Sequence, residues 1–322
     1  PTKISDLIQA GKTSVLDISV YSSTSTFNVR ALIIGLVSKK LFNQRILARK
    51  REEIQAITHG LDSKEEKREI HKSIDTVLKS GNLILSKENL SLEKKIAKLT
   101  KQKYCLTLNS GTDALMMSLW ASGIKKDDEV ITTPLSFVAT VNSIIHIGAK
   151  PVFVDVGDDL NINPDLIEKS ITKKTKAILP VHWGGRVCNM DLICKIAKKY
   201  NLIIIEDAAQ AIGAYFKNKH AGNFGKISAF SLHPYKNLSG LGDGGFIVTN
   251  QKNLYDKIKI YRNHGLHGYN NIQFSGVNSR LDALHAAVVN LRLKKLSSNI
   301  NYKRKNVSLY KRLITTKEVK MI

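Results

Sequence analysis

The sequence contains little proline, tryptophan or cysteine, and it has no apolar run long enough to cross a membrane. Its 322 residues include 6 prolines, 2 tryptophans and 3 cysteines. Because Cys105, Cys188 and Cys194 are odd in number and lack zinc-ligand spacing, they favour packing roles in a reducing compartment. The apolar run at residues 31–37 is much shorter than the roughly 20 residues of a membrane helix, and no small-residue cleavage site follows it. We therefore expect a cytoplasmic globular protein without a membrane span.

Several familiar motifs are also missing. The glycine-rich stretch GLGDGG at residues 240–245 precedes a strand-like run instead of a helix, so it is not a dinucleotide-binding turn. The sequence has no P-loop, no G-x-S-x-G motif, and no His, Cys or Asp cluster with metal-ligand spacing. These absences disfavour hydride transfer on NAD and P-loop hydrolysis, and they leave no residue predicted to bind a metal.

Acidic residues are scarce relative to basic ones. The chain has 50 Lys and Arg against 27 Asp and Glu, a formal net charge of +23, and residues 284–317 contain no acidic side chain. A charge of this size can indicate nucleic-acid binding. However, the lysines are spread along the chain and no nucleic-acid-binding motif accompanies them, so we do not expect that partner. A basic rim can equally steer small molecules that carry a diphosphate.

Apolar strand-like runs alternate with helical patterns through the middle of the chain. Most of these runs are too continuously apolar to have a face in water, which is typical of a largely parallel sheet covered on both sides. The sequence therefore predicts an α/β fold, a three-layer sandwich with a mostly parallel central sheet. The predicted strands are DEVITTP, KPVFVDV, KAILPVH, LIIIEDA, SAFSLH and GGFIVTN.

Three regions follow from this pattern. Residues 1–63 carry no motif and read as a mostly helical, unassigned segment. Residues 64–250 form the predicted large domain, which begins with two amphipathic helices, one from Lys64 to a stop at Gly81 and one after Asn89. Residues 251–322 are helical and basic, and they are too short for an independent core. We therefore expect them to be the start of a small C-terminal domain that is cut off.

The candidate site is centred on Lys236, in a glycine-rich bend between two strand-like runs. Pyridoxal phosphate needs an amine to bind its carbonyl carbon, and it needs a carboxylate beside its pyridine nitrogen. Lys236 and Asp207, the latter at the end of LIIIEDA, supply these groups. Phe137 offers an aromatic plate for the ring. Hydroxyls and backbone N–H groups for the phosphate are available at Ser110, Gly111, Thr112 and Ser231. Taken one at a time, a lysine is usually a solvated surface charge, and Ser110 or Thr112 is usually a helix cap.

Five segments in order carry a resemblance to a known family. They are NSGTDAL, DDEVITTPLSFVATVNSIIHIGAKPVFVDV, EDAAQAIGA, FSLHPYKNLSGLGDGGFIVTN, and RNHG with GVNSRLDALHAA. Over residues 64–307 the chain resembles the nucleotide-sugar aminotransferases of the DegT/StrS group, which are fold type I pyridoxal-phosphate enzymes.

The resemblance implies a role for each matching residue. Lys236 would bind the cofactor covalently, and Asp207 would pair with the pyridinium nitrogen. Ala209 and Phe137 would lie on opposite faces of the ring, with Gln210 near its phenolic oxygen. Gly111, Thr112 and Ser231 would hold the phosphate together with Asn278 from a second subunit of a homodimer. From the residues alone, Asn278 is as readily a polar loop residue that caps the helix beginning near Leu281.

The implied reaction is a two-stage transamination. The amino group of an amino acid, by analogy glutamate, would pass to a keto sugar linked to a nucleotide, in surface-polysaccharide or amino-sugar biosynthesis. The stretch from Gly81, GNLILSKE, departs from the family by lacking its usual aromatic residue and second glycine, which leaves the sugar undefined. Two alternatives stay open: a sugar dehydratase on the same scaffold, which carries histidine where Lys236 stands, and a catalytically inactive homologue with a binding role.

Overall fold

The computed structural model describes residues 64–268 and 270–314. The segment predicted to be mostly helical, residues 1–63, lies outside the described residues, as do residues 315–322. The described residues from Glu65 to Ile314 form one compact unit. The sequence-based boundary at residue 250 between a large and a small domain stays a prediction.

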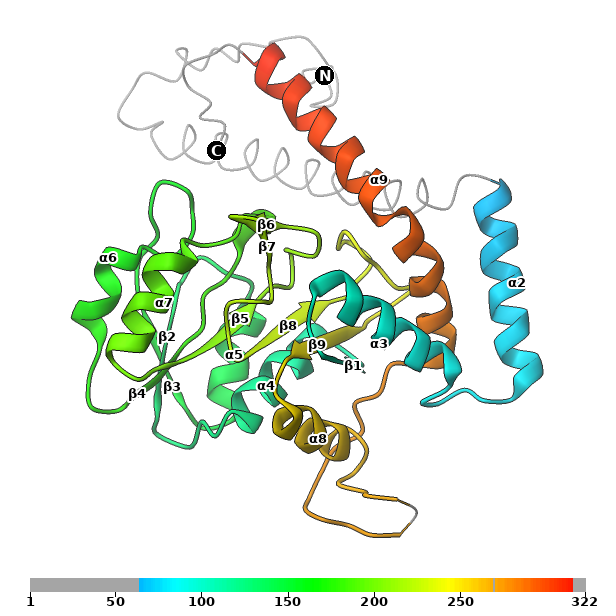
Figure 1. The fold of residues 1–322 in the computed structure, drawn as a ribbon, viewed down its shortest axis with the longest axis horizontal. Coiled ribbons are helices and arrows are strands. Elements are labelled where there is room, and N and C mark those ends of the chain that lie inside the picture. The colour runs from blue at the N-terminus through cyan, green and yellow to red at the C-terminus, as the bar shows by residue number, and fades with distance from the viewer. Residues whose placement is uncertain (1–63, 269, 315–322) are drawn as a thin grey trace, which may run out of the picture. The chain divides into compact units, whose positions relative to one another are not determined.

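A mixed sheet of seven strands forms the centre of this unit (Figure 1). Its order is β1-β9-β8-β5-β4-β2-β3, with β9 antiparallel to both of its neighbours and the other neighbouring pairs parallel. The strands are β1 (Tyr104–Leu108), β2 (Glu129–Thr132), β3 (Lys150–Phe153), β4 (Thr175–Ile178), β5 (Ile203–Asp207), β8 (Ile227–Ser231) and β9 (Gly245–Thr249). The fold class predicted from the alternation of strands and helices is confirmed.

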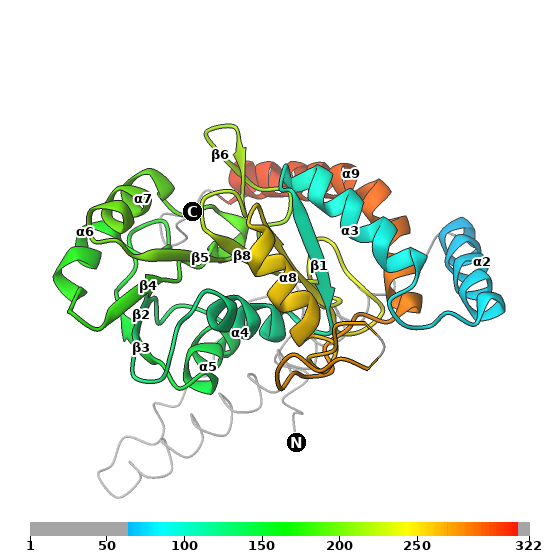
Figure 2. The ribbon, with the colours of Figure 1, turned by 60° about the horizontal axis from the view of Figure 1, so that its bottom comes forward.

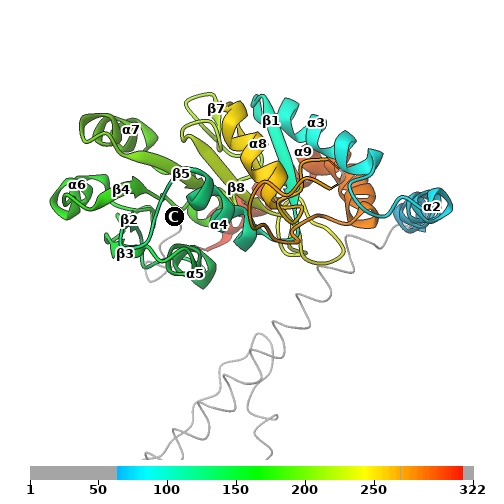
Figure 3. The ribbon, with the colours of Figure 1, turned by 90° about the horizontal axis from the view of Figure 1, so that it is seen from below.

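Helices pack on both faces of the sheet because successive strand residues point to opposite sides and both sets are apolar. On β5, Ile204 belongs to one buried cluster and Ile205 to the other. The first cluster includes residues of α3, α7 and α9, and the second includes residues of α4, α5 and α8. Figure 2 shows α3 and α8 on either side of β1, and Figure 3 shows α7 and α5 on opposite sides of β2 and β4.

The helices begin and end close to the positions that the sequence predicts. Gly81, with φ of 68°, follows the end of α2 as expected. The second helix starts earlier than predicted, because Ser86 and Asn89 form a capping box that places its first residue at Lys87. The α-helices are α2 (Lys64–Ser80), α3 (Lys87–Thr100), α4 (Gly111–Ala121), α5 (Val138–His146), α6 (Pro164–Ile167), α7 (Met190–Lys199), α8 (Lys252–Tyr261) and α9 (Ala283–Leu313).

Smaller elements occupy the connections. Two single 3₁₀ turns, Glu168–Ser170 and Trp183–Gly185, and a short hairpin of β6 (Tyr215–Phe216) and β7 (Lys219–His220) were not predicted from the sequence. These pieces are two or three residues long, too short to show a hydrophobic period. Within residues 64–268 and 270–314, none of the helices is both long and apolar enough to span a lipid bilayer.

Candidate active site

Several of the predicted site residues lie at one edge of the sheet. Because β1, β2, β5 and β8 run in the same direction, their carboxyl ends share an edge, and α4 and α5 start there after β1 and β2. Asp207 is the last residue of β5 and Ser231 the last of β8. Open α/β sheets bind ligands at this edge, where strand ends present side chains and helix starts present free N–H groups.

Asp207 is buried at this edge and held by two donors. The Thr140 hydroxyl donates to Oδ2 at 2.7 Å, and the Ala209 backbone N–H donates to Oδ1 at 3.1 Å. Burial raises the pKa of Asp207 above its ordinary value of 3.8, against these hydrogen bonds and the charges of His182 and Lys236. The carboxylate is therefore fixed in orientation but costly to keep ionised, and a cation placed beside it is favoured.

Lys236 lies near that carboxylate in the bend after β8. Its side chain is half-buried, and its backbone N–H donates to the His233 carbonyl at 2.9 Å. Burial lowers the pKa of Lys236 below 10.5, and the charge of Asp207 opposes that change. The two charges thus act on each other, as the sequence-based site requires. A lysine with a lowered pKa has a larger fraction of neutral, nucleophilic amine near neutral pH.

The start of α4 and the end of β8 are in close contact and form a small cup. A Cβ atom added to Gly111 would lie 2.8 Å from Cβ of Ser231, so only glycine fits there without movement. Gly111 is the first residue of α4, where backbone N–H groups lack helical partners. Ser110 is the N-cap of this helix, and its hydroxyl accepts from the Asp113 N–H at 3.0 Å. Thr112, next along, is half-buried.

The remaining predicted residues are Phe137, Ala209, Gln210 and Asn278. Phe137 is the N-cap residue of α5 and is 68% exposed, three residues before Thr140. The Gln210 side chain accepts from the Gly184 N–H at 2.8 Å. Asn278 is exposed and accepts from Nε of Arg280 at 2.9 Å. The assigned roles of Phe137, Ala209, Gln210 and Asn278 remain predictions.

Three residues of this region were missed by sequence reasoning. Thr140 follows Phe137 by one helical turn. This spacing, on a helix that starts at the sheet edge, could have predicted that Thr140 faces the site. The other two are His182 and Glu206, the residue that precedes Asp207. Nε2 of His182 is 3.0 Å from Oε2 of Glu206, and both side chains are fully buried. The segment that follows β4 pairs here with the end of β5, because the His182 N–H donates to the Asp207 carbonyl at 3.0 Å.

Glu206 accepts hydrogen bonds from three backbone N–H groups between residues 222 and 225. Its Oε1 accepts from the N–H groups of Phe224 and Gly225 and from the Ser228 hydroxyl, at 2.8, 2.6 and 3.0 Å. Its Oε2 accepts from the Gly222 N–H at 2.7 Å. Burial alone would raise the pKa of Glu206, but these bonds and His182 lower it below 4.5. Burial also disfavours protonation of His182, yet hydrogen bonds and charges of Cys188 and Glu206 raise its pKa to about 10.

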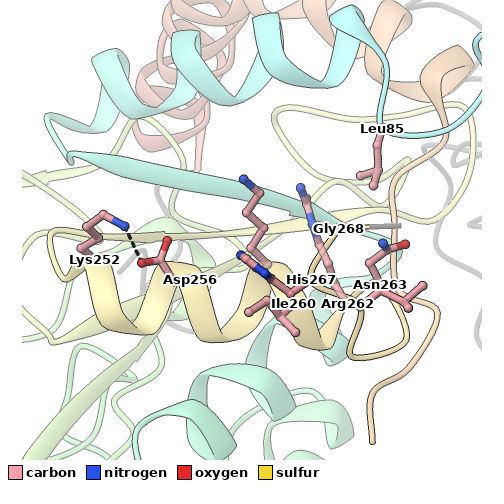
Figure 4. Close-up of a pocket in the computed structure, with 10 residues that line it drawn as sticks. Leu85, Lys252, Asp256, Ile260, Arg262, Asn263, His267 and Gly268 are labelled. Atoms are coloured by element: carbon pink, nitrogen blue, oxygen red, sulfur yellow. Dashed lines mark hydrogen bonds and ion pairs between the residues drawn. The ribbon is translucent and has the colours of Figure 1, made fainter. Parts of the chain in front are cut away.

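A separate surface pocket lies along α8 (Figure 4). It is lined by Leu85, Lys259, Ile260, Arg262, Asn263, Leu266, His267 and Gly268, together with Lys252 and Asp256, which form an ion pair one helical turn apart. Arg262, buried at its wall, is committed elsewhere: its guanidinium contacts Glu93 at 2.9 Å and the Thr107 carbonyl at 2.6 Å. None of the predicted cofactor residues lines this pocket, so it is distinct from the candidate site.

Comparison with known proteins identifies the family. The model of the DegT/DnrJ/EryC1/StrS aminotransferase family matches residues 64–321. The chain belongs to this family. It is 41% identical over 249 residues to the "Pleiotropic regulatory protein" of Geobacillus stearothermophilus, covering 77% of this chain and 67% of that protein. It is 40% identical to the UDP-2-acetamido-2-deoxy-3-oxo-D-glucuronate aminotransferase of Pseudomonas aeruginosa, covering 76% of this chain and 68% of that one.

A solved structure adds the cofactor. NtdA of Bacillus subtilis with bound pyridoxamine phosphate (PMP) is 34% identical and superposes with a TM-score of 0.72, over 77% of this chain and 57% of that one. The predicted family, its fold and its pyridoxal-phosphate chemistry are thus confirmed for this aminotransferase chain. The chain spans only part of these relatives. Its own residues fit the cofactor: a cup closed to any Cβ at Gly111, a buried carboxylate, and an amine of lowered pKa.

Proposed function

We propose that this aminotransferase moves an amino group from an amino acid, glutamate, to the keto group of a nucleotide-linked sugar, in surface-polysaccharide or amino-sugar biosynthesis. The observation that carries the proposal is the electrostatic coupling of Lys236 with Asp207 at the edge where Gly111 meets Ser231. An amine, an acid and an anion cup at one edge match the three ends of pyridoxal phosphate. The P. aeruginosa relative is named as an aminotransferase of a UDP-linked oxo sugar, which supports this substrate class.

Lys236 has two tasks in this proposal. It binds the cofactor between turnovers, and when displaced by the amino-acid substrate its Nζ accepts the proton from the carbon that bears the amino group. A general base works best when its pKa is close to the working pH. Burial moves the pKa of Lys236 in that direction.

The residues around Lys236 bind and orient. Asp207 holds a proton at the ring nitrogen, and Thr140 and the Ala209 N–H fix the direction of its carboxylate. Gly111, with the first turn of α4, and Ser231 bind the phosphate, while Phe137 and Ala209 cover the ring faces. When bound, pyridoxal phosphate supplies the electron sink that makes the substrate C–H bond acidic.

We further propose that the working form is a homodimer in which Asn278 of a second copy completes the phosphate site. Asn278 is exposed and forms an isolated antiparallel bridge with Asn263. This exposure leaves its amide available to a neighbouring subunit. A dimer contact of this kind predicts that mixing Lys236→Ala and Asn278→Ala chains restores part of the activity lost in each.

The decisive experiment replaces Lys236 with alanine. The unmodified chain should take up pyridoxal phosphate with a visible absorption band, and borohydride should fix the cofactor on the peptide that contains Lys236. Lys236→Ala should lose the band, the fixed mass and amino transfer. Lys198→Ala, at an exposed position in α7, is the matched control and should keep all three.

The same assays separate the alternatives. Transfer of labelled nitrogen from glutamate to the sugar is expected for a transaminase. Loss of a sugar hydroxyl without nitrogen transfer would indicate a dehydratase. A chain that takes up no cofactor would be an inactive homologue with a binding role. Unchanged turnover by Lys236→Ala would refute the assignment of Lys236.

A further inference from the structure

The loop that carries Lys236 has little structure of its own. Residues 232–244, between β8 and β9, contain no helix or strand. Their ends are tied together by backbone bonds, from the Leu232 N–H to the Gly244 carbonyl at 2.8 Å and from the Gly240 N–H to the Leu232 carbonyl at 2.7 Å. Three glycines in this loop, Gly240, Gly242 and Gly244, increase its conformational freedom, so contacts from outside the loop are needed to order it. Local bonds shape the bend at Lys236, such as that from its N–H to the His233 carbonyl, but the position of the bend as a whole also depends on what contacts the loop.

One stripe of α9 touches it with hydrogen-bond donors. His285, Arg292 and Lys303 follow each other at intervals of seven and eleven residues, close to two and three helical turns, so they share a face. Nδ1 of His285 is 3.2 Å from the Asp243 carbonyl, and Nζ of Lys303 donates to Oδ1 of Asn237 at 2.7 Å. Figure 1 shows α9 running alongside this part of the chain. The helix supplies donors along the length of the loop, and the loop supplies acceptors.

Arg292 makes the central and densest contact. One guanidinium nitrogen, Nη1, lies 3.1 Å from the Ser239 carbonyl, 3.0 Å from the Ser239 hydroxyl and 2.8 Å from the Gly240 carbonyl. The side chain is half-buried, and burial lowers its pKa, which still leaves the guanidinium charged. Hydrogen bonds from a charged donor are about twice as strong as neutral ones, and partial burial strengthens them further.

We propose that Arg292 is a positioning residue for the transamination site. It fixes residues 237–243 against α9 and thereby holds Lys236, three residues before Ser239, opposite Asp207. This inference rests on the proposed function for its consequence, but the clamp itself is a property of the protein without cofactor. A reacting group held at the correct place gains a large effective concentration, and a group on a freed loop loses it. The neighbouring donors His285 and Lys303 assist at the two ends of the loop.

The first test measures the loop without cofactor. Amide hydrogen exchange, followed by mass spectrometry on peptides covering residues 237–243, should be about tenfold faster in Arg292→Ala than in the unmodified chain, because charge-assisted bonds that restrain the loop are lost. Arg292→Lys should fall between the two, since it keeps the charge but lacks the guanidinium geometry. Arg304→Ala removes an arginine from an exposed position of the same helix and should exchange like the unmodified chain.

The second test measures the consequence for Lys236. After mixing with pyridoxal phosphate, Arg292→Ala should form the visible absorption band about tenfold more slowly, while the amount of cofactor bound at saturation stays the same because the phosphate cup and Asp207 are intact. Exchange in peptides of β5 and α4 should not change, which separates a local effect from general unfolding.

The outcomes are separable. Exchange in Arg292→Ala within twofold of the unmodified chain would overturn the clamp. Faster exchange with an unchanged rate of band formation would overturn its role in placing Lys236. If the unmodified chain takes up no pyridoxal phosphate, the proposed function fails, while the exchange result still decides whether α9 holds the loop.

Discussion

Replacing Glu206 with glutamine should destabilise this aminotransferase far more than its conservative chemistry suggests. The carboxylate accepts five hydrogen bonds, from three backbone N–H groups between residues 222 and 225, from the Ser228 hydroxyl and from His182. All five partners are donors, and the carboxylate is fully buried. A glutamine side chain is nearly the same size, but it turns one of the two acceptor oxygens into a donor.

The magnitude follows from counting the donors that lose an acceptor. With the amide nitrogen at the position of Oε2, it faces the Gly222 N–H and Nε2 of His182. With the nitrogen at Oε1, it faces the N–H groups of Phe224 and Gly225. At least two buried donors are left without an acceptor in either orientation, and each costs about 1–3 kcal/mol. The free energy of unfolding should therefore fall by about 2–6 kcal/mol, a large share of the 5–15 kcal/mol typical of a domain.

The loss should depend on pH. The pKa of Glu206 is lowered on folding, so its stabilisation is present above 4.5 and disappears as the pH falls through the lower folded-state value. The pKa of His182 is raised from 6.5 to about 10, so its stabilisation is complete below 6.5 and disappears as the pH rises towards 10. The difference between the unmodified chain and Glu206→Gln should therefore be largest between about pH 4.5 and 6.5.

Urea unfolding followed by circular dichroism, repeated on the protein without cofactor from below pH 4.5 to about pH 10, gives the required free energies. Glu168→Gln is the matched control: its carboxylate also contacts a lysine and a hydroxyl, but at the surface, and the unfolding midpoint should hardly move. A loss below about 1 kcal/mol in Glu206→Gln, or a loss of the same size at every pH, would refute the assignment of buried donors to this carboxylate.

Two substitutions test the cofactor site itself. Gly111→Ala should weaken pyridoxal phosphate binding at least about tenfold and cost about 1–3 kcal/mol of stability, because the new methyl group lies 2.8 Å from Cβ of Ser231. Fluorescence titration and urea unfolding measure both, and Gly157→Ala, where the nearest atom is at 3.5 Å, should change neither. Thr140→Val removes the hydroxyl that lowers the pKa of Asp207, so the acid limb of the pH–rate profile should move to higher pH, and Thr140→Ser should restore it. An unmoved acid limb in Thr140→Val would contradict this role of the hydroxyl.

Much of the fold could be predicted from the sequence, because apolar strand runs and helical periods are local patterns that repeat along the chain. Continuous apolar strands with two covered faces leave few alternatives to a layered α/β fold, and β5 illustrates this: Ile204 and Ile205 both face buried clusters. The capping box at Ser86 and Asn89 is also local, yet the start of α3 was placed too late because the apolar period was weighed above the cap. The order of the motifs was enough to identify the family.

The remainder of the site depends on contacts between segments far apart in the sequence. Thr140 and Asp207 are 67 residues apart, and no periodic pattern connects them. Arg292 reaches the lysine loop across 53 residues, from a helix whose stripe of donors resembles any solvated basic face. Such pairs become visible only when the sheet brings β2, β5 and β8 to one edge and α9 covers the loop after β8. Sequence patterns predict the elements, but the partners of polar side chains come from their assembly.

Glu206 and Asp207 show how the fold divides chemistry between two adjacent carboxylates. Because strand residues alternate, Glu206 points to the face of Ile204 and Asp207 to the face of Ile205, where Thr140 lies on α5. Glu206 has five donors, and its pKa falls despite burial. Asp207 has two, and its pKa rises. A buried carboxylate that accepts enough hydrogen bonds to stay ionised has a structural role. A buried carboxylate with few hydrogen-bond donors still favours a positive charge beside it. The same burial that makes Asp207 costly to ionise therefore favours a cation beside it, such as the protonated ring nitrogen that we propose it binds.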